Sequence, residues 1–310
     1  MALIAFVAWS KLSKRTKLIA EALGIDLWFF KDHAPYMRNI YKTLSMGRRA
    51  KALLVQLPQG PLLAEAMFLK ERFGCKLFAD VHTAFLVEEN VKGIILNKPF
   101  RSLLKHVDVA IAHNACEASL MPRDKTIVVY DPWVVMERHN PPSTDGNYLV
   151  MPCSFHSDEP VENVLSAAAK SNIKMYVTGD WRKRPRLMQL YKRFSNITFT
   201  GFLPEEEYLN LLAGCRGMVA ATKREYTTLC AAWEALAFNK PLALSNTKAL
   251  KQTFDGYAAF FDWQDENSIA EALEEVMKRR PASEEREKLR EITFTQLRNL
   301  KSYLDALVGQ

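Results

Sequence analysis

Short apolar runs alternate with amphipathic segments along the first 130 residues of the chain. Each run is five to seven residues long and rich in aliphatic and aromatic side chains, which is typical of strands buried on both faces of a parallel sheet. The pattern predicts strands at residues 3–9, 26–30, 51–57, 76–80, 107–113 and 126–130. The segments between them predict helices at 13–24, 61–73 and 100–106. Ser13 is the expected N-cap of the first helix, and Gly24 is its expected C-terminal stop.

The same alternation begins again after a polar segment. Residues 131–147 are rich in Pro, Ser, Asp and Gly, which indicates a linker. The chain beyond it predicts strands at 148–152, 173–179, 197–201, 217–222 and 241–245, and helices at 161–170, 185–194, 204–214 and 229–238. Two successive sets of this kind predict an α/β protein with two doubly wound domains, residues 1–140 and 147–310.

The last predicted helix covers residues 283–307. It carries one apolar stripe, formed by Leu289, Ile292, Leu297, Leu300, Leu304 and Leu307. A stripe of this kind predicts a helix that packs back onto the protein along one side.

The composition is that of a folded protein, with 48% hydrophobic and 25% charged residues. The N-terminus places apolar residues before positive charge, the reverse of a secretory signal, so we expect a cytoplasmic protein. The five cysteines are dispersed without a CxxC pair, and the six histidines show no ligand spacing. We therefore predict reduced thiols and no metal site.

The net charge of +7 is confined to the first half of the chain. Residues 1–140 contain 20 basic and 13 acidic residues, whereas residues 141–310 contain 22 of each. The excess suits a partner that carries phosphate or an anionic membrane surface, and equally a merely solvated surface. We expect no nucleic-acid partner, because no motif for one accompanies the charge.

Residues 36–49 combine positive charge with large apolar side chains. The apolar members are Tyr36, Met37, Ile40, Tyr41 and Leu44, and the basic ones are Arg38, Lys42, Arg48 and Arg49. Two interpretations stay open here. Such a face could rest on an anionic membrane as a peripheral contact, or the segment could be an ordinary amphipathic helix packed on the sheet.

Glu234 lies within the apolar helix predicted at 229–238. A carboxylate there is costly unless something pairs with it. The residues just before this helix are charged or hydroxylated, from Lys223 to Thr228. A helix start that follows a strand is also a natural anion site, because its free N–H groups point outward.

Four segments carry a resemblance to a known family. They are 150-VMPCSFHSDEPVENVLSAA-168, 176-YVTGDWRKRP-185, 197-ITFTGFLPEEEYLNLLAGC-215 and 225-EYTTLCAAWEALAFNKPLALSN-246. Together they resemble the donor-binding half of the GT-B glycosyltransferases of family-4 type, the glycosyl transferases group 1. The first segment is also similar to dolichol-linked chitobiose mannosyltransferases. The resemblance implies two Rossmann-like domains facing a cleft, with the terminal helix packing back, and residues 147–310 as the donor-binding domain.

The resemblance further implies a nucleotide-diphosphate sugar as donor and no cofactor. In this family the second acid of the last segment accepts the ribose hydroxyls, a role that falls to Glu234. The first acid contacts the transferred sugar, and its position holds Tyr226, with Glu225 one residue earlier. The diphosphate would lie at the helix start with Thr227, Thr228 and Leu229. The remaining expected donor contacts are Ser154, His156, Gly179, Gly201 and Phe202, the last near the nucleobase, although a core role for Phe202 is the alternative.

We expect the catalytic groups at strand ends. Asp80 and His82 close the strand 76–80, and His82 could bind the donor sugar or the acceptor hydroxyl. Arg182 and Lys183 could stabilise the leaving diphosphate, and Lys223 and Arg224 compete for that role.

The predicted activity is a metal-independent, hexosyltransferase-type glycosyl transfer to an acceptor hydroxyl of a glycan or lipid-linked molecule. The family-4 relatives retain and the dolichol-linked enzymes invert anomeric configuration, so the outcome stays open. A sugar-nucleotide epimerase and a catalytically degenerate nucleotide-sugar-binding protein are the alternatives.

Overall fold

The structure, a computed structural model, describes residues 3–33, 36–87, 91–137 and 146–309. The chain divides into two compact units. Residues 1–132 and 292–310 form unit 1, and residues 133–291 form unit 2. The sequence had placed the whole terminal helix in the second domain, whereas its last part groups with unit 1.

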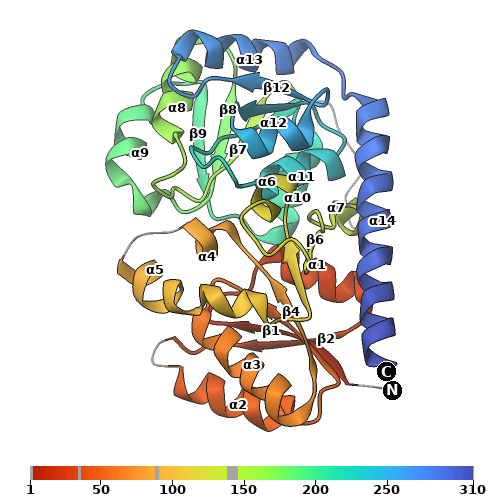
Figure 1. The fold of residues 1–310 in the computed structure, drawn as a ribbon. Coiled ribbons are helices and arrows are strands. Elements are labelled where there is room, and N and C mark those ends of the chain that lie inside the picture. The colour runs from red at the N-terminus through yellow and green to blue at the C-terminus, as the bar shows by residue number, and fades with distance from the viewer. Residues whose placement is uncertain (1–2, 34–35, 88–90, 138–145, 310) are drawn as a thin grey trace. The chain divides into compact units, whose positions relative to one another are not determined.

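Unit 1 contains a six-stranded parallel sheet (Figure 1). Its strand order is β2-β1-β3-β4-β5-β6. The strands are β1 (Ile4–Trp9), β2 (Asp26–Phe30), β3 (Ala52–Gln56), β4 (Lys76–Asp80), β5 (Val109–Ala112) and β6 (Thr126–Val128). All six predicted strands are confirmed. Strands of a sheet that is covered on both faces have continuous apolar sequences, which makes them easy to recognise.

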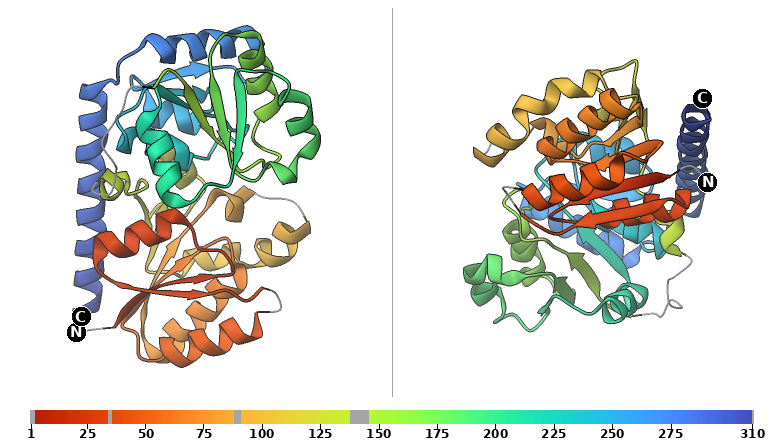
Figure 2. Two further views of the ribbon diagram at one scale, coloured as in Figure 1. Left: turned by 180° about the vertical axis from the view of Figure 1, so that it is seen from behind. Right: turned by 90° about the horizontal axis from the view of Figure 1, so that it is seen from below.

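Helices cover both faces of this sheet. They are α1 (Lys14–Leu23), α2 (Met37–Gly47), α3 (Gly60–Phe73), α4 (Thr83–Val87), α5 (Val91–Leu96), the 3₁₀ helix η1 (Lys98–Lys105) and α6 (Ala115–Ala118). On one face α2 packs on α3, α3 packs on η1, and η1 packs on α5, while α1 lies on the other face (Figures 1 and 2). The side chain of Ser13 accepts a hydrogen bond from the Thr16 amide, and Gly24 ends α1 in the left-handed conformation, as predicted.

Unit 2 contains a second six-stranded parallel sheet with the order β12-β11-β10-β7-β8-β9. The strands are β7 (Leu149–Pro152), β8 (Met175–Thr178), β9 (Ile197–Gly201), β10 (Gly217–Ala220), β11 (Leu242–Ser245) and β12 (Ala258–Phe261). The chain reverses its direction of travel across the sheet between β7 and β10. Ligands of such sheets bind outside the carboxyl ends of the strands at this reversal.

The helices of this half of the chain follow the strands in regular alternation. They are α7 (Trp133–Met136), α8 (Val161–Lys170), the 3₁₀ helix η3 (Trp181–Lys183), α9 (Pro185–Tyr191), α10 (Glu205–Gly214), α11 (Cys230–Ala237), α12 (Lys248–Phe254), α13 (Glu266–Lys278) and α14 (Ser283–Val308). The predicted linker 131–147 includes α7, and its residues 138–145 lie outside the described part of the chain. Strand β12 and helices α12 and α13 were not predicted.

The buried stripe of α14 differs from the predicted one at two positions. Leu289, Leu297, Leu300 and Leu304 are buried, but Ile292 is exposed, with Thr293 inside instead, and Leu307 is half-buried. Steps of four, four, three and four residues from Leu289 give this stripe, whereas Ile292 lies about 100° from its centre. The prediction for Ile292 was therefore wrong, because hydrophobicity was given more weight than helical phase.

No helix among the described residues is long and apolar enough to cross a membrane.

Glu65 is a buried acid on α3, in the core of unit 1. Burial raises its pKa from about 4.5 to about 8, while the Leu44 backbone acts in the opposite direction. Below about pH 4.5 the carboxyl is protonated in both the folded and the unfolded state. Between about pH 4.5 and 8 the unfolded state ionises first, so this group lowers stability as the pH rises.

Replacing Glu65 by Gln should therefore stabilise the protein in alkaline solution. We expect the free energy of unfolding of Glu65→Gln to exceed that of the parent by an amount that grows from pH 4.5 to 8 and then levels off. Denaturant unfolding across this pH range measures the difference. Glu71→Gln, on the exposed side of the same helix, is the matched control. A pH-independent difference between Glu65→Gln and the parent would contradict the buried, protonated carboxyl.

Candidate functional site

A buried arginine organises the carboxyl edge of the sheet in unit 1. Arg15, in the first turn of α1, is 2% exposed. Its Nε and Nη2 donate to Oδ1 of Asp80 at 3.0 Å each, and its Nη1 donates to Oδ1 of Asp131 at 2.9 Å. One guanidinium thus faces two carboxylates, and it joins the helix after β1 to the end of β4 and to the chain after β6. Such pairing is what a buried charge requires.

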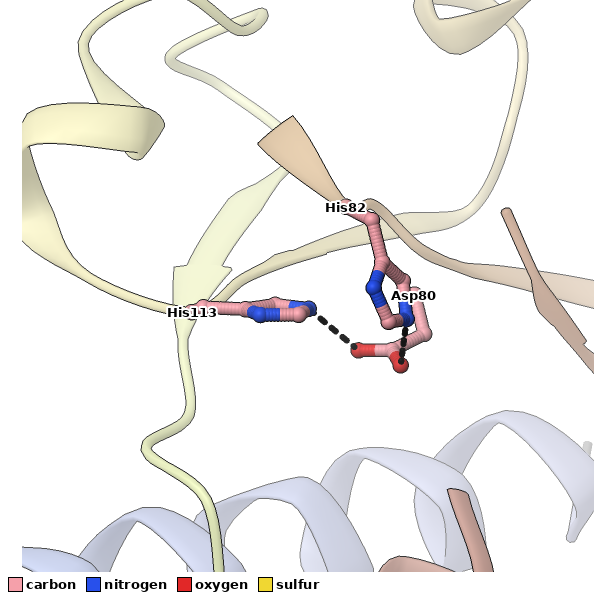
Figure 3. A group of neighbouring side chains, drawn as sticks. All are labelled: Asp80, His82 and His113. Carbon is pink, nitrogen blue, oxygen red and sulfur yellow. Dashed lines mark ion pairs between the residues drawn. The ribbon is translucent and has the colours of Figure 1, made fainter. Parts of the chain in front are cut away.

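Two histidines approach the same Asp80 carboxylate from different sides (Figure 3). Nε2 of His82 lies 3.8 Å from Oδ2, and Nε2 of His113 lies 3.7 Å from Oδ1. The two rings meet edge to face with centroids 4.5 Å apart. Both Nε2 atoms are buried, and neither has a hydrogen-bond partner among the described residues.

Both histidines are held in the neutral form. Burial lowers the pKa of His82, an effect that Arg15 and Lys11 reinforce and Asp80 and Asp131 oppose. Burial, Arg15 and His82 lower the pKa of His113 well below its ordinary value. A neutral imidazole can accept a proton at one nitrogen while the other is directed at Asp80.

Glu117 holds the two histidine-bearing segments together. Its Oε1 accepts from the Thr83 hydroxyl at 2.7 Å, and its Oε2 accepts from the His113 amide at 2.7 Å. Burial raises the pKa of Glu117 to about 7, against the effect of these two hydrogen bonds. Glu117 therefore fixes the start of α4, directly after His82, against the end of β5.

Asp80, His82 and His113 are also the described residues that could together hold a cation, since their ligand atoms lie within 4.8 Å of one another. The Arg15 guanidinium already occupies Oδ1 of Asp80 and sets a positive charge beside any ion bound there. A divalent cation fits this donor set poorly for that reason. The absence of a metal stays a prediction.

In unit 2 the loop after β7 wraps its backbone around a carboxylate. The Ser154 amide, the Ser154 hydroxyl and the His156 amide all donate to the Glu159 side chain, at 3.0, 2.8 and 3.2 Å. Phe155 adopts a left-handed backbone at φ 56° to allow this turn. A ring of donors around one anion is the geometry of a phosphate-binding nest, and Glu159 occupies it from within the chain.

The loops after β7 and β10 meet at Asp158. Its Oδ2 accepts from the Thr222 hydroxyl at 3.1 Å and lies 3.3 Å from Nε of Arg224, while its Oδ1 pairs with His156. Burial raises the pKa of Asp158, but Arg224, His156 and Thr222 outweigh it, so the net pKa is lowered. The charged Asp158 therefore ties the two strand ends that flank the reversal of the sheet.

The basic turn after β8 reaches the same loop. Nζ of Lys183 donates to the Ser154 carbonyl at 2.8 Å, and Nη2 of Arg184 donates to the His156 carbonyl at 2.6 Å. Arg182, in contrast, is exposed and pairs with Asp180 at 2.6 Å. Gly179 has φ 102°, and a Cβ there would lie 1.9 Å from the Cys153 carbonyl oxygen, so no other residue fits this strand end.

Helix α11 begins at Cys230, one residue later than predicted. Its N-cap residue is Leu229, whose side chain makes no capping hydrogen bond. The Thr227 hydroxyl just before it is buried without a hydrogen-bond partner among the described residues. Further along the helix, Glu234 is 5% exposed, and its Oε2 accepts from the Tyr208 hydroxyl of α10 at 2.6 Å. Burial and Glu234 raise the pKa of Tyr208 well above its ordinary value, so the phenol stays a donor.

Glu225 serves a structural purpose in this state. Its Oε2 accepts from the Lys248 amide at 2.8 Å, and its backbone carbonyl accepts from the Ala249 amide at 2.9 Å. Glu225 thus caps the N-terminus of α12. Tyr226, the next residue, is half-buried.

Phe202 is 84% exposed, so the core role considered for it is wrong. It follows Gly201, which ends β9 in the left-handed conformation at φ 73°. An exposed ring directly after a strand end is available for stacking.

The sequence found some of these groups and missed others. Within unit 1 the structure brings Asp80 and His82 together, and within unit 2 it brings Ser154, His156 and Lys183 together. The residues that were missed are Arg15, His113, Glu117, Asp131, Asp158, Glu159 and Tyr208. Two of them carried a signal: His113 ends a strand next to that of Asp80, and Arg15 shares the apolar side of its helix with Leu18 and Ile19.

Comparisons with known proteins agree with this architecture. A family model described as glycosyl transferases group 1 matches residues 136–296. No curated protein sequence matches the chain.

Solved structures share the fold over nearly all of their length at low sequence identity. Sucrose-phosphate synthase from Thermosynechococcus elongatus has a TM-score of 0.74 at 14% identity, covering 100% of both chains. HepE from Anabaena, solved with UDP, has a TM-score of 0.70 at 11% identity, covering 98% of this chain and 100% of its own. A glycosyltransferase from Rickettsia africae has a TM-score of 0.69 at 11% identity, covering 99% of each chain. The family model spans more than half of the chain, and the chain folds into two parallel, doubly wound sheets of the GT-B type. The chain therefore belongs to the group 1 glycosyl transferases.

Proposed function

We propose that this glycosyltransferase moves a hexosyl group from a nucleoside diphosphate sugar to an acceptor hydroxyl. The observation that carries the proposal is the buried Glu234, held by Tyr208 on a helix whose start has no side-chain cap at Leu229. HepE was solved with UDP, with UDP and glucose, and with UDP-glucose, which supports a nucleotide-sugar donor for a chain of the same fold.

In the proposed donor site Glu234 accepts the ribose hydroxyls, and Tyr208 fixes its orientation. The diphosphate lies at the start of α11 near Leu229, where free backbone N–H groups and the hydroxyls of Thr227 and Thr228 can donate to it. Gly201 and Phe202 contact the base, and Glu225 or Tyr226 contacts the sugar. Gly179 lets the chain approach the loop of Ser154 and His156 closely.

Negative charge builds on the diphosphate as the sugar leaves. Lys183 and Arg182, together with Arg184, are the side chains proposed to stabilise it, and the N-terminus of α11 adds its dipole. Lys183 and Arg184 already rest on the backbone of the loop that surrounds Glu159. Fixed donors of this kind can replace a metal ion, so we propose a metal-independent transfer without a cofactor.

On the acceptor side we propose His82 as the group that binds the sugar or accepts the proton of the attacking hydroxyl. Asp80 lies behind it, 3.8 Å from Nε2, and can orient the ring and stabilise the imidazolium that forms. The lowered pKa of His82 keeps it in the basic form near neutral pH. Before the proton is transferred, the Arg15 guanidinium pairs with the Asp80 carboxylate.

The acceptor is a glycan or a lipid-linked molecule in this proposal, and α2 supports the second. Its inner face packs Ile40 and Leu44 against the core of unit 1 and buries Asn39, Thr43 and Gly47. The Thr43 hydroxyl accepts from Nε1 of Trp9 at 3.0 Å. Its outer face exposes Met37 (69%) and Tyr41 (75%). The four basic residues of the segment, Arg38, Lys42, Arg48 and Arg49, are exposed as well. We propose a peripheral contact of this face with an anionic membrane, each basic group contributing about 1 kcal/mol.

Nucleotide binding should raise the melting temperature, because a ligand of the native state stabilises it by about 2.7 kcal/mol at a hundredfold excess over Kd. We expect a shift with one class among UDP, GDP, ADP and their common sugars. Glu234→Ala should abolish the shift. Tyr208→Phe should give a smaller shift, because the loss of one hydrogen bond to the acid weakens binding by about 1 kcal/mol. Scanning fluorimetry measures all three proteins.

Glu271→Gln, at an exposed acid on α13, is the control for this series and should keep the full shift. The donor site is refuted if no nucleotide shifts the melting temperature at millimolar concentration. A shift without any turnover would instead favour the degenerate binding protein.

Transfer should depend on the deprotonated form of His82. We expect kcat/KM for release of UDP from UDP-glucose, with an alkyl glucoside as acceptor, to fall on the acid side with a midpoint below about 6.5, because the pKa of His82 is lowered. His82→Asn should lower the rate by about 100-fold, the range of general base catalysis, and should remove this dependence. His106→Asn, exposed in the same unit, is the control and should keep it.

A millimolar excess of EDTA should leave the rate of the same reaction unchanged. A loss of activity that Mg²⁺ or Mn²⁺ restores would contradict metal-independent transfer.

An unaltered pH profile in His82→Asn would remove His82 from the acid–base role and leave it as a binding residue.

A further inference from the structure

Glu117 is a buried acid beside the histidine pair, and the proposed transfer does not use it. It lies in α6 and is 0% exposed. Its amide donates to the Asn114 side chain at 2.9 Å, which caps α6 and fixes the backbone here. Its two carboxylate oxygens accept from the Thr83 hydroxyl and from the His113 amide, at 2.7 Å each. A carboxylate enclosed in this way cannot reach a substrate, so it can act on the reaction only through the groups that it holds.

The two donors to this carboxylate lie beyond the paired part of strands β4 and β5. The residues of β5 that pair with β4 are 109–111, and His113 follows them. On the other strand His82 comes after the end of β4, and Thr83 is the next residue. Glu117 accepts from Thr83 on one segment and from the His113 backbone on the other. Its carboxylate therefore continues the connection between the two segments past the sheet, at the positions of the two histidines.

The backbone sets where each imidazole lies, because only two rotatable bonds separate the ring from the chain. The rings of His82 and His113 meet edge to face with centroids 4.5 Å apart (Figure 3). Their Nε2 atoms face different oxygens of Asp80, at 3.8 and 3.7 Å. A relative shift of the two backbone segments would separate the rings from each other and from Asp80. A displacement of about 1 Å at reacting groups can lower a rate about 100-fold.

We infer that Glu117 is a positioning residue for the transfer. Its two hydrogen bonds hold His82 and His113 at the spacing at which both rings face Asp80, so that the histidines act as a pair. His82 accepts the proton of the attacking hydroxyl, and His113 keeps the His82 ring in place through their edge-to-face contact. This inference rests on the proposed role of His82 in glycosyl transfer, and it adds Glu117 and His113 to that site.

Kinetics of UDP release from UDP-glucose, with an alkyl glucoside as acceptor, test this role. Glu117→Ala removes both hydrogen bonds, and kcat should fall about 100-fold. Thr83→Val removes one of them with a side chain of similar size, and kcat should fall about tenfold. In both variants the KM for UDP-glucose and the melting shift with UDP should keep the parent values, because the proposed donor contacts lie in unit 2. If Glu117→Ala does not fold, Thr83→Val carries the test.

NMR gives a readout that does not depend on turnover. The ring protons of His82 and His113 should show nuclear Overhauser contacts in the parent, because the ring centroids are 4.5 Å apart. These contacts should be lost in Glu117→Ala and weakened in Thr83→Val. Labelled histidine, together with the spectra of His82→Asn and His113→Asn, assigns the signals.

Conservative variants separate the hydrogen bonds from the charge. The side chain introduced by Glu117→Gln can accept from the His113 amide and donate to the Thr83 hydroxyl oxygen, so the ring contacts and most of kcat should remain. Thr83→Ser keeps the hydroxyl and should have the same outcome. A fall of kcat in Glu117→Gln as deep as in Glu117→Ala would overturn the inference, since the charge and not the positioning would then matter.

Matched controls in unit 1 account for the general cost of altering its interior. Glu65→Ala removes a buried acid of α3, and Thr126→Val removes a hydroxyl that donates to the Pro122 carbonyl at 2.6 Å. Both should leave kcat and the ring contacts unchanged, whatever their effect on the melting temperature. A raised KM for UDP-glucose with an unchanged kcat in Thr83→Val would also overturn the inference.

The positioning inference and the proposed function fail in different ways. If the parent releases no UDP and shows no nucleotide-dependent melting shift, the proposed function fails, and the ring contacts then decide whether Glu117 positions the histidines. If the parent is active and Thr83→Val keeps both its kcat and its ring contacts, the positioning inference alone fails.

Discussion

The pairing of Arg15 with two carboxylates is the constraint on which the chemistry of unit 1 depends. Asp80 and Asp131 are both buried, and without the guanidinium each would be an uncompensated charge, at a cost of about 3–5 kcal/mol for a broken buried pair. Burial lowers the pKa of His82 and of His113, and the same cation acts in the same direction on both. The ion pairs of Arg15 therefore fix the strand ends, while burial, reinforced by this cation, keeps the two imidazoles neutral.

Unit 2 handles its charges in a different way. The loop after β7 already satisfies its donors with Glu159, and Asp158 already pairs with Arg224 and His156. Lys183 and Arg184 rest on backbone carbonyls rather than on acids. The cations that face a diphosphate are therefore bound only to backbone carbonyls, whereas the backbone nest is already occupied by the Glu159 carboxylate. We expect the start of α11, where the cap side chain is absent and the Thr227 hydroxyl is unpaired among the described residues, to take the phosphate first.

The strands could be read from the sequence because their burial is a local property, and the α1 caps because Ser13 and Gly24 act on neighbouring backbone. The side chains that complete the sites could not, because they depend on which strand ends become neighbours. His113 meets Asp80 only because β5 pairs with β4, and Arg15 meets Asp131 across 116 positions of the chain. Glu225 shows a further limit. It lies one residue before the position of the expected sugar contact, and the start of α12 lies close enough for the Glu225 carboxylate to cap that helix.

The net charge is divided unevenly along the chain. Residues 141–310 are neutral overall, and the cations at the strand ends of unit 2 contact either an acid, as Arg224 does, or backbone carbonyls, as Lys183 and Arg184 do. Unit 1 carries the whole positive excess, and much of it lies on the outer layer of α2, with exposed apolar side chains beside it. Acids that would neutralise this layer are absent from residues 36–51, and Glu65, which lies behind α2 on α3, is buried and protonated near neutral pH. The proposed membrane contact depends on this combination, since lipid headgroups would match the charge and the interface would accept the aliphatic groups.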